Sequence, residues 1–319
     1  MSFSLKLLIK SIMKNLTYTF SLFMLFVINN SHAQYDANSL NINSLNVNTA
    51  HSEFGFTPYA DGFLFASNKN ANAKTPFYDL FYKNTKTNKV RYFSTMLDTP
   101  LNQCSVVFTS DLNTVYFTGN IAPFEKFNKR SKEQLTLKIY KADFVKGSYK
   151  NVQELPFSSS SYSIAFPALS PDGTKLYFSS DMPGGYGASD IYVVNINADG
   201  SFSEPKNLGE KINTKGRDNH PFVGQDNMLY FSSDGRNGMG GLDIYKYDLV
   251  FDSAVLLLGN GINSVKDDFA FSIAEDNKYA RFTSNRKNNN DDIYQINLQN
   301  QIIQNQDIKK PTTLSVVYD

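Results

Sequence analysis

Four aspartates recur at the start of similar short phrases, and carboxylates in such a pattern could do chemistry. Asp190, Asp243 and Asp292 each open the tripeptide Asp-Ile-Tyr, and Asp79 opens the looser version Asp-Leu-Phe. A ring of carboxylates could ligate a metal ion, and a suitably spaced pair could hydrolyse a glycosidic bond. A residue that recurs once per repeat is more simply explained as an acceptor for the turn of its own repeat. We therefore predict a structural role for all four, with no metal ion and no cofactor.

The histidines and the single cysteine complete no catalytic pattern. No serine or cysteine motif accompanies His32, His51 or His220, and the Gly-x-Ser-x-Gly motif is absent. Cys104 lies in the apolar stretch QCSVVF, which predicts a buried, unreactive thiol. One cysteine excludes an intrachain disulfide and a cysteine-built metal site. These residues predict that the chain is not an enzyme; a five-bladed glycosidase is the enzyme alternative.

The elements that carry these aspartates form a pattern repeated five times. Each copy has an aromatic or small apolar start, a turn, a short strand that ends in Phe plus a small polar residue, and a second strand. The strand-ending phenylalanines are 52, 61, 53 and 51 residues apart, at Phe65, Phe117, Phe178, Phe231 and Phe282. This period fits a propeller blade and exceeds that of most solenoid repeats. The sequence predicts an all-β, single β-propeller with five blades of four-stranded antiparallel sheet, and six blades are the alternative.

The turns and linkers repeat as well as the strands. In the clearest copy Pro171, Asp172 and Gly173 are suited to a tight reversal, because Pro presets φ, Asp bonds back to the backbone and Gly accepts a positive φ. A second phrase recurs between the copies, as LNVNT from Leu45, LGEKINTKGRD from Leu208 and LGNGINSVKDD from Leu258. Asp172 and Gly173 are therefore predicted as structural repeat positions.

The N-terminus has the composition of an export signal. A basic start precedes an apolar run too short for a bilayer span, and small residues at Ser31 and Ala33 suit cleavage before Gln34. An uncleaved N-terminal anchor is the alternative, and Met13 is an alternative start. We predict a signal peptide over 1–33, a propeller over 34–298, and a tail or closing strand over 299–319. The mature chain is predicted to have no transmembrane span.

The repeat phrases resemble a known group of envelope propellers. FPALSPDGTKLYFSSDMPGGYGASDIY and LYFSSDGRNGMGGLDIY are similar to the WD-like repeats of TolB-type proteins and of Bacteroidetes OmpA-family proteins associated with type IX secretion. The resemblance covers about residues 45–297. It implies a non-catalytic protein-interaction or scaffold module at the periplasm or the periplasmic face of the outer membrane. Recognition of a glycan or peptidoglycan fragment is the alternative.

Charge limits the partners and suggests two binding surfaces. Without residues 1–33 the chain has 28 basic and 30 acidic residues, which gives a formal charge of −2. This charge does not suggest a nucleic-acid partner. We expect a monomer that binds envelope proteins. One candidate surface is a basic and aromatic loop that contains Phe124, Lys126, Phe127, Lys129, Arg130 and Lys132. The alternative is that this loop is solvated and binds no partner. A second comprises Arg217, Arg236 and Arg286.

Overall fold

A computed structural model describes residues 41–70, 78–93, 97, 102–120, 136–259, 261–274 and 276–298. The chain divides into two compact units, residues 1–36 and 37–319, and all the described residues belong to the second. The predicted signal peptide, the tail over 299–319 and the six residues of the basic and aromatic loop lie outside the described residues. Within the described part, no helix is long and apolar enough to cross a membrane.

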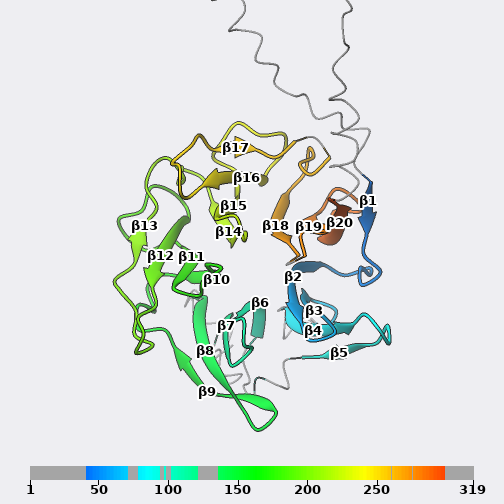
Figure 1. The fold of residues 1–319 in the computed structure, drawn as a ribbon. Helices are drawn as coiled ribbons and strands as arrows, with labels where there is room; N and C mark the ends of the chain where they lie inside the picture. Colours follow the sequence, from blue (N-terminus) through cyan, green and yellow to red (C-terminus); the bar gives the residue numbers. More distant parts are fainter. Residues whose placement is uncertain are drawn as a thin grey trace, which may run out of the picture. The chain divides into compact units, whose positions relative to one another are not determined.

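Five four-stranded antiparallel sheets form a ring, which confirms the predicted five-bladed β-propeller (Figure 1). The first blade contains β2 (Glu53–Tyr59), β3 (Gly62–Ser67), β4 (Asp79–Asn84) and β5 (Val90–Tyr92). The second contains β6 (Asn102–Phe108), β7 (Thr114–Asn120), β8 (Lys138–Val145) and β9 (Ser148–Glu154). The third contains β10 (Ile164–Leu169), β11 (Lys175–Ser180), β12 (Asp190–Asn195) and β13 (Lys206–Asn207). The fourth contains β14 (Asp218–Val223), β15 (Met228–Ser233), β16 (Asp243–Asp248) and β17 (Leu256–Leu257).

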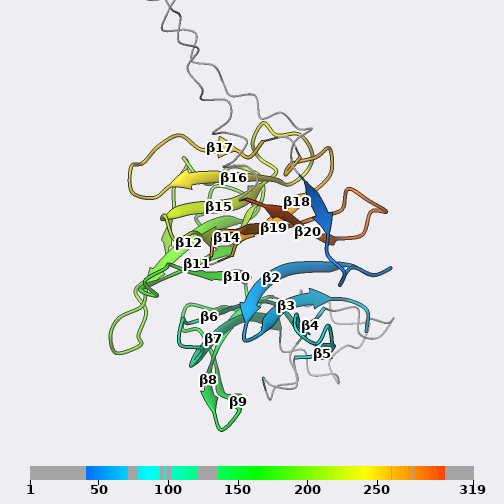
Figure 2. The same ribbon diagram turned by 45° about the vertical axis from the view of Figure 1, so that its right-hand side comes forward.

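The fifth blade combines the two ends of the described chain. It contains β18 (Asp268–Ile273), β19 (Tyr279–Ser284) and β20 (Asp292–Asn297), and its fourth strand is β1 (Ile42–Ser44). β1 lies beside β20 (Figure 2). The two strands pair antiparallel, with Ile42 opposite Ile296. This pairing joins the first and last blades, so the ring has no open edge between them.

The core lies between the blades because the second strand of each of the first four blades is apolar on both faces. In the third blade Leu176 and Phe178 are fully buried and pack against Tyr116 and Ile139 of the second blade. Ser179 and Ser180, which follow Phe178, are also buried, and small side chains fit this crowded part of the blade. The aliphatic and aromatic composition of these strands therefore holds neighbouring sheets face to face.

Two aspartates of the Asp-Ile-Tyr phrases, Asp190 and Asp243, hold the glycine-rich loops that precede them. Asp190 accepts hydrogen bonds from the backbone N–H groups of Tyr186, at 2.5 Å, and Gly187, at 3.2 Å. Asp243 accepts the equivalent bonds from Met239 and Gly240, at 2.8 and 3.0 Å. A side chain at Gly187 would place its Cβ 2.2 Å from the carbonyl oxygen of Thr214, so the loop requires glycine for its close approach to the next linker.

An asparagine explains the recurring linker phrase. In each copy its side-chain oxygen accepts the N–H of an Ile in the preceding blade, and its amide donates to the carbonyl of the same Ile. The bonds are 2.8–3.0 Å long and join Asn48 to Ile293, Asn213 to Ile191 and Asn263 to Ile244. The linker thus satisfies both polar groups of a strand residue and fastens one blade to the next.

Candidate binding site in the central cavity

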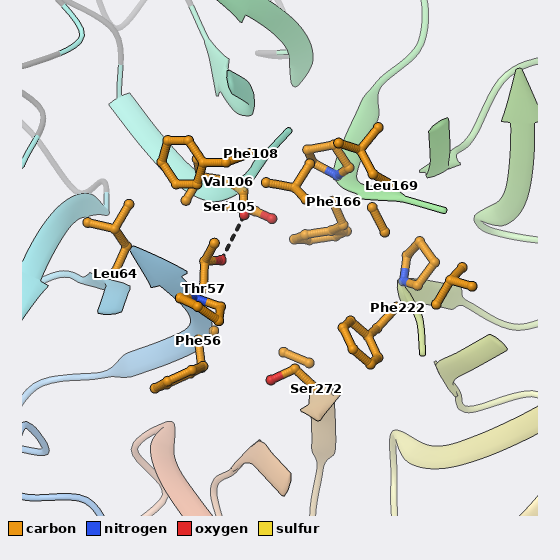
Figure 3. Close-up of a pocket in the computed structure, with 18 of the residues that line it drawn as sticks. Phe56, Thr57, Leu64, Ser105, Val106, Phe108, Phe166, Leu169, Phe222 and Ser272 are labelled. Atoms are coloured by element: carbon orange, nitrogen blue, oxygen red, sulfur yellow. Dashed lines mark hydrogen bonds between the residues drawn. The ribbon is translucent and has the colours of Figure 1, made fainter. Parts of the chain in front are cut away.

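The innermost strands β2, β6, β10, β14 and β18 surround a cavity of about 570 Å³ at the centre of the ring. Half-buried aromatic residues line it. Figure 3 shows the rings of Phe166 and Phe222 directed into the cavity, whereas the rings of Phe56 and Phe108 point between the blades, where they pack on Phe63 and Tyr59. Aliphatic residues and prolines supply about half of the remaining lining, and the rest is mainly serine, threonine and other polar residues and glycine. The volume is in the range of small-ligand pockets, and the lining combines apolar side chains with polar ones.

A β-bulge in each innermost strand shapes this lining. The pairing with the second strand shifts register at the bulge, and four bulges hold a residue at positive φ: Gly55 at 72°, Phe166 at 57°, His220 at 50° and Ala270 at 52°. Such a backbone is unfavourable for residues other than glycine and persists where surrounding contacts fix it. Two of these contacts are bonds from the N–H of Gly55 to Thr283 and from that of Phe166 to Thr118.

Aromatic rings from four blades meet at the bulges. The His220 imidazole stacks on Phe166, with ring centroids 3.7 Å apart, and also contacts Phe269 at 4.9 Å and Phe54 at 6.3 Å. The strands run from this cluster towards hairpin turns whose residues are exposed and also line the cavity, such as Asp172 and Asn277. The cluster therefore forms the floor of the cavity, and the turns form its rim.

The two reactive side chains of the cavity are uncharged at neutral pH. Burial among the aromatic rings, assisted by the charge of Arg217, lowers the pKa of His220 to about 3. Its Nδ1 lies 2.8 Å from the side-chain oxygen of Asn219. Burial also raises the pKa of the Cys104 thiol to about 12, so the thiol stays protonated. The imidazole is a weak base at this pKa, and the thiol is a weak nucleophile.

Carboxylates occur only at the rim of the described lining, where each serves its own turn. Asp172 accepts bonds from Ser170 Oγ at 2.5 Å and from the N–H of Thr174 at 3.1 Å. Asp111 is held in the same way by Thr109 and Asn113. These hydrogen bonds keep the pKa of both aspartates below its usual value. In the described part of the chain, no group of three or more His, Cys, Asp or Glu residues could hold a metal ion.

The arginines predicted as a binding surface contact the protein itself. Arg286 donates to the carbonyl oxygens of Gly261 and Ile262, at 2.7 and 2.5 Å, and pairs with the buried Asp268 at 2.6 Å. Arg236 donates to the equivalent carbonyl of Ile212, at 2.8 Å. The third, Arg217, forms an exposed ion pair with Asp234 at 2.7 Å. None of the three lines the central cavity.

The repeated aspartates are also placed away from the cavity, with the exception of Asp172. Neither Asp79, Asp190, Asp243 nor Asp292 is among its lining residues, whereas Asp172 and Gly173 belong to the rim. Asp79 accepts bonds from the Tyr92 hydroxyl at 3.0 Å and from the Asn70 amide at 3.2 Å. Burial raises the pKa of Asp292. These positions separate the repeated carboxylates from the residues that could contact a ligand at the centre of the ring.

Comparison with known proteins shows similarity of fold. No family model matches the chain, and no curated protein matches its sequence. Similar solved structures include a gluconolactonase from Xanthomonas campestris, with a TM-score of 0.50 and 13% identity, covering 84% of this chain and 93% of that one. A putative TolB from Agrobacterium tumefaciens has a TM-score of 0.48 and 14% identity, covering 74% and 71%. An oligogalacturonate lyase in complex with manganese has a TM-score of 0.42 and 11% identity, covering 81% and 96%.

The fold similarity to the gluconolactonase corrects the prediction that the chain is not an enzyme. The prediction rested on the absence of a catalytic motif around the histidines and the cysteine, whereas a gluconolactonase shares the propeller fold. Propeller architecture therefore does not exclude catalysis. At 13% identity the similarity shows the fold alone, so it assigns no reaction to this chain.

Proposed function

We propose that the chain is a binding propeller of the bacterial cell envelope that takes an apolar segment of a partner protein into its central cavity. The observation that carries this proposal is the cavity lining, to which all five blades contribute half-buried apolar side chains. Burial of one large apolar side chain contributes about 1.5–3 kcal/mol, so a segment with two such residues could bind by contact with this lining. A rigid ring also holds the lining in place before the partner arrives.

The polar groups of the cavity favour a protein segment over a glycan. A glycan needs many hydrogen-bond partners, and several of those in the cavity are already engaged. The Thr57 hydroxyl donates to the carbonyl of Val106 at 2.7 Å (Figure 3), and the rim aspartates accept bonds from their own turns. A glycan or peptidoglycan fragment is accordingly the second occupant to test, and an apolar segment is the one we propose.

The envelope location is supported by the sequence. Residues 1–33 have the composition of an export signal, and the repeat phrases resemble those of OmpA-family and TolB-type envelope propellers. We propose a periplasmic protein, or one at the periplasmic face of the outer membrane, that works as a scaffold in an OmpA-like or type IX secretion assembly. The basic and aromatic loop that contains Phe124 and Arg130 is proposed as an additional contact.

A pair of identical substitutions tests the cavity. Leu169 is half-buried and lines the cavity, whereas Leu256 is 51% exposed on the outer strand of the fourth blade. Tagged wild type, Leu169→Gln and Leu256→Gln are crosslinked in the native envelope, and captured proteins are identified by mass spectrometry. We expect a specific envelope protein with the wild type and Leu256→Gln, and its loss with Leu169→Gln. Equal recovery with all three would contradict binding in the cavity.

The glycan alternative has its own measurement. Purified peptidoglycan fragments are titrated into the same three proteins in a calorimeter. We expect no saturable heat. Saturable heat that disappears only with Leu169→Gln would replace the proposed protein segment with a glycan.

A further inference from the structure

A second cavity, of about 490 Å³, lies between the first and fifth blades, beside the strand that closes the ring. The hairpin turns of the first blade line one side, and the other side comes from the chain after β1 and from β19 and β20. This second cavity shares only Phe56 with the lining of the central one. Its charged lining residues are Asp61, Lys83, Lys86 and Arg281.

Arg281 breaks the repeat at a position that is otherwise apolar. The residue directly before the strand-ending phenylalanine is buried in the other four blades, where it is Leu64, Tyr116, Tyr177 or Tyr230. In the fifth blade the same position holds an arginine. A cation among apolar equivalents departs from the pattern that stabilises the fold, and such departures occur mainly at functional sites.

The Arg281 guanidinium is held in place without a carboxylate. Its Cζ lies 3.9 Å from the centre of the Phe56 ring, and its Nε–H donates to Gln295 Oε1 at 2.9 Å. The side chain forms no ion pair with the described residues, and Asp276, whose charge acts on it, pairs with Lys278 at 3.1 Å. Burial lowers the pKa of Arg281 to about 10, so it remains a cation at neutral pH. Its Nη groups have no hydrogen-bond partner among the described residues.

The surrounding groups leave the second cavity positively charged. Lys86 and Asp61 neutralise each other at 2.7 Å. Lys83 is 5% exposed and donates to the carbonyl oxygen of Asn88 at 3.0 Å, with no carboxylate in the lining to balance it. Two cations, Lys83 and Arg281, therefore remain uncompensated. The side-chain amides of Asn46, Asn88 and Gln295 add hydrogen-bonding groups to the same lining.

We propose that the second cavity binds an oxyanion, the carboxylate or phosphate group of a larger ligand, on the guanidinium of Arg281. The planar guanidinium presents paired N–H donors that match two oxygens of a carboxylate or phosphate. Its stacking on Phe56 and its bond to Gln295 fix the direction of this fork in advance. The volume exceeds that of a single ion, so the anionic group belongs to a molecule that fills the rest of the cavity. This site does not depend on an occupant in the central cavity.

The test is a titration of the isotopically labelled chain with inorganic phosphate and, separately, with acetate, followed by NMR. Sodium chloride at equal ionic strength is the control for screening. We expect saturable shifts of the Arg281 Nε–H and Gln295 amide signals with at least one oxyanion. The response to phosphate and to acetate distinguishes the two chemical sources.

Variants identify the residue responsible. Arg281→Gln is expected to weaken binding at least about tenfold, and Arg281→Lys to weaken it less, since it keeps the charge without the fork. Lys211→Gln removes a surface cation on another blade and is expected to bind as the wild type does. Circular dichroism establishes that each variant is folded. The proposal is overturned if the wild type shows no saturable shift, if chloride produces the same shift, or if folded Arg281→Gln binds equally well.

Discussion

Asn48 holds the backbone of Ile293, a residue 245 positions further along the chain, by two hydrogen bonds. The Ile293 N–H donates to Asn48 Oδ1 at 2.9 Å, and Asn48 Nδ2 donates to the Ile293 carbonyl at 2.8 Å. The same arrangement joins consecutive blades at Asn213 and Asn263. Only at Asn48 does it join the first blade to the last. The pair of asparagine hydrogen bonds that joins consecutive blades elsewhere therefore closes the ring at Asn48, together with the pairing of β1 and β20.

Asn48→Ala is expected to lower the free energy of unfolding by about 2 kcal/mol, because both backbone groups of Ile293 lose their side-chain partner. Urea unfolding followed by circular dichroism measures the change. Asn46→Ala is the matched control. Asn46 is exposed and makes one bond of 3.4 Å to Asn88, so we expect a change within about 0.5 kcal/mol. Equal effects of the two substitutions would contradict the role of Asn48 in ring closure.

Arg286→Met is expected to destabilise the fold by about 3–5 kcal/mol, because it leaves the fully buried carboxylate of Asp268 without its cation. Arg217→Met removes an ion pair whose arginine is 52% exposed, so we expect about 0–1 kcal/mol. Both values come from urea unfolding. If Arg286→Met instead left stability unchanged and weakened the capture of a partner, the predicted arginine surface would be supported over the structural role.

His220 is expected to make stability fall as the pH decreases. Its imidazole has an ordinary pKa of 6.5 in the unfolded chain and a pKa of about 3 in the folded one. Between these values the unfolded state binds a proton that the folded state does not. The stabilisation is therefore fully present above pH 6.5 and is lost as the pH falls towards 3. At pH 4 the loss is roughly 3 kcal/mol.

His220→Phe tests this dependence, since Phe166 occupies the equivalent bulge at a similar positive φ. Unfolding is measured at several values between pH 7 and pH 4 for both proteins. The rim aspartates contribute equally to both, so their effects cancel in the difference. We expect the wild type to lose more stability than the variant over this range. Parallel curves would mean that His220 binds its proton equally in the folded and unfolded states, so that folding does not lower its pKa.

Cys104 is expected to react slowly with iodoacetamide while the chain is folded. Its pKa of about 12 leaves little thiolate at pH 8, so alkylation should be at least about a hundredfold slower than in urea. Mass spectrometry follows the reaction without ambiguity because the sequence contains one cysteine. Equal rates in the folded and unfolded chain would show that the thiol ionises normally beside the cavity.

Much of the fold could be predicted because its strongest features are local and repeated. The phenylalanines that end the second strands mark the blades, and Pro171 and Gly173 mark a turn that a few neighbouring residues determine. The number of blades followed from counting these phrases. The strand that closes the ring was harder to assign, since β1 is three residues long and its partner in β20 lies at the other end of the described chain.

The cavity could not be predicted because it depends on backbone shape. The bulges at Phe166 and His220 require a positive φ, which is uncommon for residues other than glycine, so residue type alone is a poor guide to them. The signal that the two residues share is the proline that follows each of them, in Phe-Pro and His-Pro. The sequence also shows that Arg281 is the one cation directly before a strand-ending phenylalanine. The cavity beside it could not be predicted, because most of its lining comes from the first blade, which is distant in the sequence.

Ring closure by β1 also sets a time order for biosynthesis. β1 leaves the ribosome before every blade, yet its partner strand is made about 250 residues later, since Ser44 pairs with Tyr294. At about 5–20 residues per second this delay is roughly 10–50 s. During that interval the nascent chain is an open arc with one unpaired edge, and a chaperone or export factor could hold it extended. A strand of only three residues offers other chains little to pair with, which protects the unfinished propeller until its last blade emerges.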